Sequence, residues 1–259
     1  MVGKERFMDL QLAGKRALVT GGSRGIGRVI ALALAREGVD VAIAARGREQ
    51  LEKTAIEISG LTRQRVLPVF ADTGDDASVS SMVTSVAEEL GGLDILVNNA
   101  AAPGGAAPGA TLLEATAANL LADINVKTGG YLRTAKSAAP YFLAQGWGRI
   151  INIGGVTARR TGHYVASIRN AGVSALTKNL ADELGPKGIN VNAINPSATR
   201  TERTDAAVAE WAGRHTTIGR IVDAEEIAWL VLFLASPKSA AVNGATIAAG
   251  GGMPGVIDY

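Results

Sequence analysis

The sequence predicts an α/β fold in which one parallel sheet of about seven strands carries helices on both faces. Short runs rich in Val and Ile alternate with longer helical patterns along the chain. Most of the short runs are apolar throughout, which is typical of strands that are buried on both faces of a parallel sheet. No Pro/Ser-rich linker, charge block or internal repeat interrupts the 259 residues. We therefore expect a single doubly wound domain over residues 1–259.

The first half of the chain supplies four predicted strands. Each is a short run dominated by Val, Ile, Leu and Ala, and a helical pattern separates each one from the next. The predicted strands are 16–20, 39–44, 66–70 and 93–97, and the helices between them are 26–38, 50–59 and 76–90. A stretch of Gly, Ala and Pro at 100–110 follows the fourth strand. It is either a flexible connection or one wall of a pocket.

The second half repeats the alternation. Helical patterns cover 111–144, 167–184 and 224–234, and the predicted strands are 149–153, 188–194 and 245–248. Because each strand precedes a crossover helix, the strands are predicted to run parallel.

Composition excludes several classes of site. The chain has no cysteine and only two histidines, which excludes disulfides, a thiol nucleophile and a histidine-rich metal centre; we predict no metal site. Its 26 basic and 24 acidic residues give a net charge of +2, and we expect no nucleic-acid partner. No apolar run approaches the ~18 residues that span a membrane, and the N-terminus lacks the apolar core of a secretory signal. We expect a cytoplasmic protein without a membrane partner.

Glycine is over-represented, at 32 of 259 residues, and its clusters are informative. Thr20-Gly-Gly-Ser-Arg-Gly-Ile-Gly27 follows the first strand and opens a helix. Glycines there permit a tight turn and close approach of a pyrophosphate to the helix N-terminus. The alternative, a glycine-rich turn without a ligand, is less consistent with the surrounding strand–turn–helix unit. The predicted cofactor-binding residues in this loop are Gly21, Ser23, Arg24, Gly25, Ile26 and Gly27.

The end of the second strand favours NADP(H) over NAD(H). An acidic residue there would accept hydrogen bonds from the adenosine ribose. This chain instead has Ala44-Ala45-Arg46-Gly47-Arg48. Arg46, with Arg24 opposite, is suited to hold a 2′-phosphate, although both arginines could also be solvated.

From Gly14 to Gly252 the sequence resembles the short-chain dehydrogenase/reductase family, and in general terms its acyl-carrier-protein ketoreductases. The family motif T-G-x-x-x-G-x-G corresponds to 20–27, N-N-A-G to 98–101, and P-G-x-x-x-T to 196–201, the last two without their glycine. The resemblance implies a Rossmann-like fold, a homotetramer or dimer, and an active-site asparagine at Asn125. It also implies that the cofactor contacts Asp72, Thr73, Asn99, Ala100, Pro196 and Thr201.

The family's catalytic Ser and Y-x-x-x-K are not matched. Gly155 stands where the serine is expected. If Tyr164 is the family tyrosine, Ile168 occupies the lysine position; if Asn170-Ala171-Gly172 matches the family's K-A-G, Ala166 occupies the tyrosine position. The sequence leaves both alignments open, and we retain Tyr164 as the candidate proton donor.

Neighbouring side chains offer partial substitutes. His163 offers an imidazole that could act as an acid, but a lone His at a loop–helix junction is more often a surface or capping residue. Thr157 supplies a hydroxyl if its loop bends inward and is otherwise solvated. Arg159, Arg160 and Arg169 form either a solvated basic cluster or a site for an anionic substrate group.

Two functions follow. The first is an NADP(H)-dependent oxidoreductase acting on a carbonyl or alcohol of a small molecule through a non-standard active site. The second is an NADP(H)-binding scaffold, sensor or inactive subunit without turnover. The fold alone does not choose between them.

Overall fold

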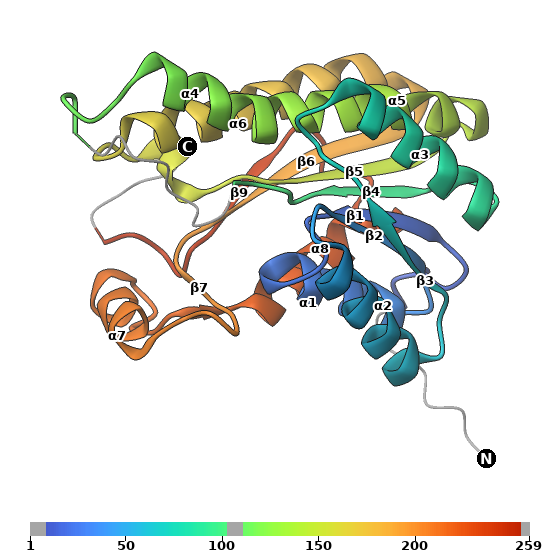
Figure 1. The fold of residues 1–259 in the computed structure, drawn as a ribbon, viewed down its shortest axis with the longest axis horizontal. Coiled ribbons are helices and arrows are strands. Elements are labelled where there is room, and N and C mark those ends of the chain that lie inside the picture. The colour runs from blue at the N-terminus through green and yellow to red at the C-terminus, as the bar shows by residue number, and fades with distance from the viewer. Residues whose placement is uncertain (1–8, 103–110, 255–259) are drawn as a thin grey trace.

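The computed structural model describes residues 9–102 and 111–254, and a seven-stranded parallel sheet runs through it (Figure 1). The strands are β1 (Arg16–Thr20), β2 (Asp40–Ala45), β3 (Val66–Phe70), β4 (Ile95–Asn98), β5 (Gly148–Ile153), β6 (Ile189–Pro196) and β9 (Thr246–Ala249). Their order across the sheet is β3-β2-β1-β4-β5-β6-β9. The order reverses between β1 and β4, and a crevice for ligands forms outside the carboxyl ends of the strands at such a point. The predicted doubly wound fold is confirmed.

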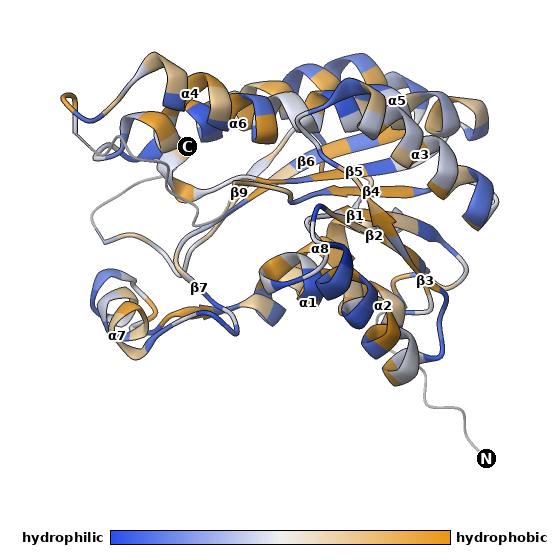
Figure 2. Cartoon of the chain, viewed as in Figure 1, coloured by the Kyte–Doolittle hydropathy of each residue, from blue (hydrophilic) through white to orange (hydrophobic). Residues whose placement is uncertain are grey.

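Helices cover both faces of the sheet (Figure 1). On one face lie α1 (Gly25–Arg36), α2 (Arg48–Thr62) and α8 (Ala224–Ala235); on the other lie α3 (Asp76–Leu90), α4 (Ala117–Ile124), α5 (Gly130–Gln145) and α6 (Tyr164–Leu184). Each layer has its own apolar core, because every inner strand presents side chains to both faces. Figure 2 shows apolar residues along the strands of the sheet.

The predicted helical region 111–144 is interrupted. In the structure α4 begins only at Ala117, and a π-helical segment η1 (Asn125–Gly129) separates it from α5. A π turn accommodates an additional residue and rotates the side chains that follow it, and such turns are common at functional sites. Local sequence patterns contain no signal for the π turn, and the predicted helical coverage was wrong at 111–116, where no helix forms.

A small substructure outside the sheet was not predicted. It consists of α7 (Ala206–His215) and two short paired strands, β7 (Thr199–Arg200) and β8 (Val222–Asp223), at the edge of the molecule (Figure 1). Strands of two residues have too little pattern to be recognised in a sequence. Only Ala212 of α7 is fully buried, so this helix also lacks a continuous apolar face. Three short helical turns complete the chain: η2 (Val156–Arg159), η3 (Gly185–Lys187) and η4 (Pro237–Ser239).

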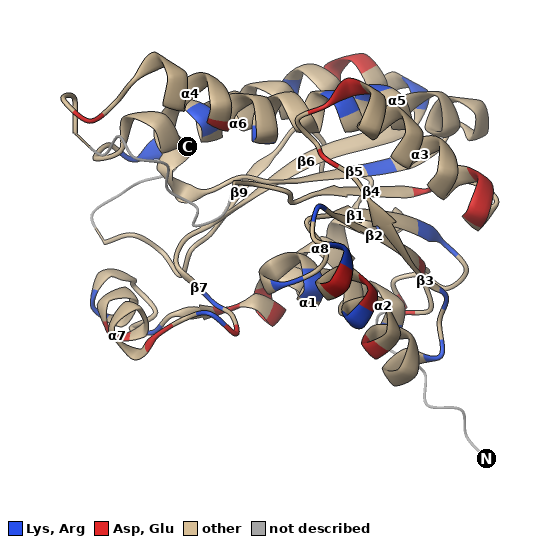
Figure 3. Cartoon of the chain, viewed as in Figure 1, with Lys and Arg blue, Asp and Glu red and all other residues tan. Residues whose placement is uncertain are grey.

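Charges of both signs are interspersed over the helices and loops of both layers (Figure 3). Within residues 9–102 and 111–254, no helix is long and apolar enough to cross a membrane, and no cluster of three metal-ligating side chains is present. Most of the predicted pocket loop 100–110, including Gly104, Gly105 and Gly109, lies outside the described residues.

Candidate active site

The glycine-rich loop between β1 and α1 folds as a tight turn. Gly21 has a φ of +68°, which favours glycine, and its N–H donates to the Ala44 carbonyl at 2.7 Å. A Cβ on Gly27 would lie 2.3 Å from the Gly21 carbonyl oxygen, so α1 starts against the turn only because Gly27 has no side chain. The loop therefore presents backbone N–H groups at the N-terminus of α1, the arrangement that binds phosphate groups.

Asn99 fixes this loop from the end of β4. Its Nδ2 donates to the carbonyls of Thr20 at 3.1 Å and Gly21 at 3.2 Å. In return the Thr20 hydroxyl accepts the N–H groups of Asn99 at 3.0 Å and Ala100 at 3.1 Å. Two predicted cofactor-binding residues thus lie directly beside the loop.

The other loop residues differ in exposure. Ser23 is buried and its carbonyl accepts a bond from Thr54 Oγ1, whereas Ile26 is half-buried. Arg24 is exposed, as is Arg46 after β2, and among the described residues neither has an ion-pair partner. The N–H of Gly25 donates to both carboxylate oxygens of Glu202, at 3.0 and 3.3 Å, a contact that was not predicted.

The predicted residues after β3 and β6 lie at the carboxyl edge of the sheet. Asp72 is half-buried, and its Oδ1 accepts the N–H of Gly74 at 2.9 Å. Thr73 is buried and donates to the Val126 carbonyl. Pro196 ends β6, and Thr201 follows β7, where its N–H donates to Thr204 Oγ1 at 2.9 Å.

At the end of β5, Gly155 faces Asn170 of α6. A Cβ on Gly155 would lie 2.7 Å from Asn170 Nδ2. Asn170 is buried, its Nδ2 donates to Thr157 Oγ1 at 2.6 Å, and its Oδ1 has no hydrogen-bond partner. Thr157 Oγ1 in turn donates to the Ala166 carbonyl at 3.3 Å. The loop therefore does bend inward and brings the Thr157 hydroxyl between Gly155 and α6.

These contacts describe the helix faces around Tyr164. Ala166 and Asn170, four residues apart, lie on the helix face that meets Thr157. Tyr164 is the first residue of α6, and its side chain is half-exposed. Two residues rotate a helix by about 200°, so Tyr164 and Ala166 lie on nearly opposite sides of α6. Tyr164 therefore does not share the helix face that meets Thr157.

His163 acts as the N-cap of α6. Its Nδ1 accepts the N–H of Ala166 at 3.2 Å, satisfying one of the free donors at the start of the helix. The capping role expected from its position is therefore confirmed.

The three-arginine cluster predicted from the sequence does not form. Arg159 and Arg160 are exposed at η2. Arg169 is instead buried, and its Nη1 donates to both oxygens of Asp123 at 2.8 and 3.0 Å. An arginine that is held inside by a carboxylate cannot belong to a surface cluster, so its interpretation as part of one was wrong.

Asn125 begins the π turn and is exposed. Its Nδ2 donates to the Gly74 carbonyl at 3.2 Å, while its Oδ1 and its backbone carbonyl accept bonds from Arg133 at 2.7 and 2.9 Å. These bonds hold Asn125 beside the segment that follows β3. The structure does not show it in contact with Gly155, Thr157 or Asn170.

Lys127 is the site residue that the sequence did not reveal. The π turn directs it inward, where it is buried and its Nζ donates to the Gly154 carbonyl at 2.8 Å. The pKa of Lys127 is lowered to about 7, chiefly by burial; the nearby Arg169 adds to the lowering and Asp123 partly opposes it. Without the π turn, a lysine in an amphipathic helix is expected at the surface.

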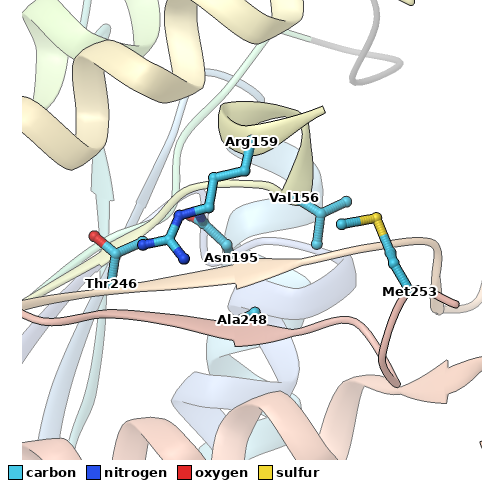
Figure 4. Close-up of a pocket in the computed structure, with 6 residues that line it drawn as sticks. All are labelled: Val156, Arg159, Asn195, Thr246, Ala248 and Met253. Atoms are coloured by element: carbon cyan, nitrogen blue, oxygen red, sulfur yellow. The ribbon is translucent and has the colours of Figure 1, made fainter. Parts of the chain in front are cut away.

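A small pocket lies beside these residues, at the carboxyl ends of β6 and β9 (Figure 4). It is lined by Val156, Arg159, Asn195, Thr246, Ala248 and Met253. Arg159 extends from η2 toward Asn195 and Thr246. Asn195 Oδ1 also accepts the N–H of Gly155 at 3.0 Å, which connects the pocket to the end of β5.

Comparisons with known proteins identify the family to which the chain is similar. A family model described as enoyl-(acyl-carrier-protein) reductase matches residues 21–254. The short-chain dehydrogenase/reductase astE of Aspergillus oryzae is 37% identical over 263 residues, covering 98% of this chain and 99% of the relative. The 3-oxoacyl-[acyl-carrier-protein] reductase FabG of Staphylococcus aureus is 36% identical over 257 residues, covering 92% of this chain and 98% of the relative.

A solved structure extends the likeness to three dimensions. L-sorbose reductase of Gluconobacter frateurii, complexed with NADPH and L-sorbose, superimposes with a TM-score of 0.88 at 29% identity, covering 96% of this chain and all of that one. Together with the phosphate loop at the sheet's reversal point, these matches show that the chain belongs to the short-chain dehydrogenase/reductase family of NAD(P)-dependent oxidoreductases, which act on carbonyl and alcohol substrates.

Proposed function

We propose that this chain binds NADP(H) and uses it to interconvert a carbonyl and an alcohol on a small-molecule substrate, through an active site without the usual Ser and Lys. One observation carries the proposal: the Thr157 hydroxyl is fixed by Asn170 at the carboxyl end of β5, on the edge of the sheet where the phosphate loop also lies. A hydroxyl group held in place there can bond the substrate oxygen.

Arg46 and Arg24 support the choice of NADP(H). Both are exposed on the adenosine side of the crevice, and no carboxylate occupies the end of β2. A 2′-phosphate placed between two guanidinium groups gains charge-assisted hydrogen bonds, whereas NAD(H) would leave these cations unpaired. Asp72 lies near the expected adenine, and Pro196 and Thr201 near the expected nicotinamide. When bound, the cofactor supplies or accepts the hydride.

Within the substrate site, Thr157 and Tyr164 have different roles. Thr157 Oγ1 can turn its proton from the Ala166 carbonyl to the substrate oxygen while Asn170 Nδ2 keeps the hydroxyl in place. Tyr164 stays the candidate proton donor, because it carries a half-exposed phenol at the first residue of α6, although it does not share the helix face that meets Thr157. The phenol of Tyr131 is buried and donates to the Ile153 carbonyl; burial raises the pKa of Tyr131 far above its usual range, which makes it unsuited to donate a proton.

A second function is favoured by the residues at the family's catalytic positions. Gly155, Ala166 and Asn170 carry neither a phenol nor an amine, although the phosphate loop and its Asn99 brace are complete. A protein that binds NADP(H) as a scaffold, sensor or inactive partner would retain the phosphate loop and Asn99. It would not need a phenol or an amine at the catalytic positions.

Two measurements distinguish these functions. NADPH binding is followed by the change in its fluorescence, and NADPH oxidation is followed with ketones, acyl thioesters and quinones. The oxidoreductase predicts oxidation with at least one class and loss of most of that activity in Tyr164→Phe and Thr157→Val. Binding without oxidation across the panel favours the second function. Absence of NADPH binding contradicts both.

The chain's assembly and its substrate's charge are further proposals. We infer a homotetramer, or a dimer, because Leu121, Leu132 and Ile168 are exposed apolar residues on α4, α5 and α6. Arg159 and Arg160, exposed next to the site, suit a substrate with an anionic group. Light scattering after size-exclusion chromatography tests the first inference, and a preference for acidic over neutral ketones tests the second. A cytoplasmic location stays a prediction.

A further inference from the structure

The N-terminus of α1, where the cofactor pyrophosphate is expected, already holds an anionic side chain. Both carboxylate oxygens of Glu202 lie within hydrogen-bond distance of the Gly25 nitrogen, at 3.0 and 3.3 Å. Glu202 is 177 residues away along the chain and comes from the segment between β7 and α7. The contact is therefore one of tertiary structure and not a local turn.

Helix α1 provides no cap of its own. The side chain of its N-cap, Arg24, makes no capping hydrogen bond, and its first turn contains no acidic residue. The first N–H groups of a helix carry partial positive charge and need an acceptor. The Glu202 carboxylate supplies that acceptor, at the N–H group to which a phosphate oxygen would bind.

The neighbouring residue carries the opposite charge. Arg203 Nη2 lies 3.4 Å from the position that a Cβ on Gly25 would occupy, so the guanidinium group lies over the same loop. Its Nε lies 3.9 Å from Glu202 Oε1, a distance that makes only a loose ion pair. The sequence Glu202-Arg203 thus places one anion and one cation at the phosphate site.

We propose that Glu202 is a built-in competitor for the cofactor pyrophosphate and that Arg203 is a further phosphate-binding residue; the inference rests on the proposed NADP(H) binding. A phosphate and a carboxylate cannot both occupy the Gly25 N–H, because two anions at that distance repel each other. Cofactor binding therefore displaces Glu202, and the phosphate replaces it as the partner of Arg203. Removing either charge changes cofactor affinity, and the two changes have opposite signs.

The test compares NADPH dissociation constants, measured by fluorescence, for wild type, Glu202→Gln and Arg203→Met. Glu202→Gln is expected to lower the Kd by about 3- to 10-fold, since the anion that occupies the helix N-terminus is lost. Arg203→Met is expected to raise the Kd by about 3- to 10-fold, since a charge-assisted bond to phosphate is lost. Both effects should shrink at high salt, because the two side chains are about half-exposed.

Matched controls come from α7, where Glu210 and Arg214 form an ion pair that is more exposed than Glu202 and Arg203. Glu210→Gln and Arg214→Met should leave the Kd for NADPH within about 2-fold of wild type, because exposed pairs contribute little. A second ligand, adenosine 2′-monophosphate, has no pyrophosphate, so calorimetry should give the same affinity for wild type and Glu202→Gln.

The outcomes separate this inference from the proposed function. If wild type binds NADPH and Glu202→Gln binds it equally or more weakly, competition by Glu202 is disproved while cofactor binding stands. If Arg203→Met binds NADPH as wild type does, Arg203 is not a phosphate-binding residue. If only Glu202→Gln binds NADPH, the inference is strongly supported. If no variant binds it, both the proposed function and the inference fail.

Discussion

The Nζ of Lys127 donates a hydrogen bond to the carbonyl of Gly154 at 2.8 Å, from a position where the lysine is buried. This bond links the π turn after α4 to the end of β5, next to Gly155. The nearby charges are the buried pair of Arg169 and Asp123. Two cations and one carboxylate thus share a closed space at the edge of the site.

The first prediction concerns stability and pH. The pKa of Lys127 is lowered in the folded protein from 10.5 to about 7, so between these values the unfolded chain binds more protons than the folded one. The free energy of unfolding should therefore rise with pH across that window, by at most about 1.4 kcal/mol per pH unit from this group. The contribution of Lys127 is lost as the pH falls back from 10.5 through 7.

Urea unfolding of wild type and Lys127→Met at several pH values checks this prediction. The difference between their free energies of unfolding should shift in favour of wild type as the pH rises, whatever the offset caused by the mutation. In the control Lys187→Met, at a residue of η3, the free energy of unfolding should change with pH as it does in wild type. A pH-independent difference for Lys127→Met would mean that this lysine titrates normally.

A second prediction concerns the ion pair of Asp123 and Arg169. Asp123→Asn should destabilise the protein by about 3–5 kcal/mol, because it removes the buried carboxylate that pairs with the Arg169 guanidinium group. Asp182→Asn, which removes the partner of Lys178 from an exposed pair on α6, should cost less than about 1 kcal/mol. Equal losses of unfolding free energy in the two variants would contradict the burial of Asp123.

The features that could be predicted from the sequence are those that depend on residues close together along the chain. The strands and the glycine-rich loop follow from local patterns, so the succession of strands along the chain and the tight turn at Gly21 and Gly27 could be predicted. Lys127 was missed because its direction depends on a π turn that no local pattern specifies. The Glu202–Gly25 contact was missed because it joins segments 177 residues apart. Thr157 was left open, since only tertiary packing decides whether a loop hydroxyl points inward.

A third prediction tests Thr157 in catalysis. If the protein oxidises NADPH with any carbonyl substrate, Thr157→Val should lower kcat/KM by about 10- to 100-fold, since a hydrogen bond to the substrate oxygen is lost. Thr157→Ser keeps the hydroxyl and should stay within about 3-fold of wild type. NADPH affinity should be unchanged in both variants. A Thr157→Val enzyme of normal kcat/KM would exclude this hydroxyl from the reaction.

A fourth prediction concerns cofactor choice. Arg46→Ala should raise the Kd for NADPH by about 10-fold or more, because a charge-assisted bond to the 2′-phosphate is lost. The Kd for NADH, which lacks this phosphate, should change little. The control Arg63→Ala removes an exposed cation at the far end of α2. It should alter neither the Kd for NADPH nor the Kd for NADH. A similar loss of affinity for both cofactors would show that Arg46 acts on the fold instead of on the phosphate.

The last prediction rebuilds the family's catalytic residues on this backbone. Gly155→Ser alone should crowd Asn170, since even a Cβ would lie 2.7 Å from its Nδ2. The triple variant Gly155→Ser, Ala166→Tyr, Asn170→Lys replaces that amide and places a phenol and an amine one turn apart on α6, facing Thr157. General acid catalysis by a positioned group contributes about 10²- to 10⁴-fold, so NADPH oxidation with ketones should rise by at least about 10²-fold. If a folded triple variant that binds NADPH shows no gain, the limit on turnover lies in substrate binding and not at these three positions.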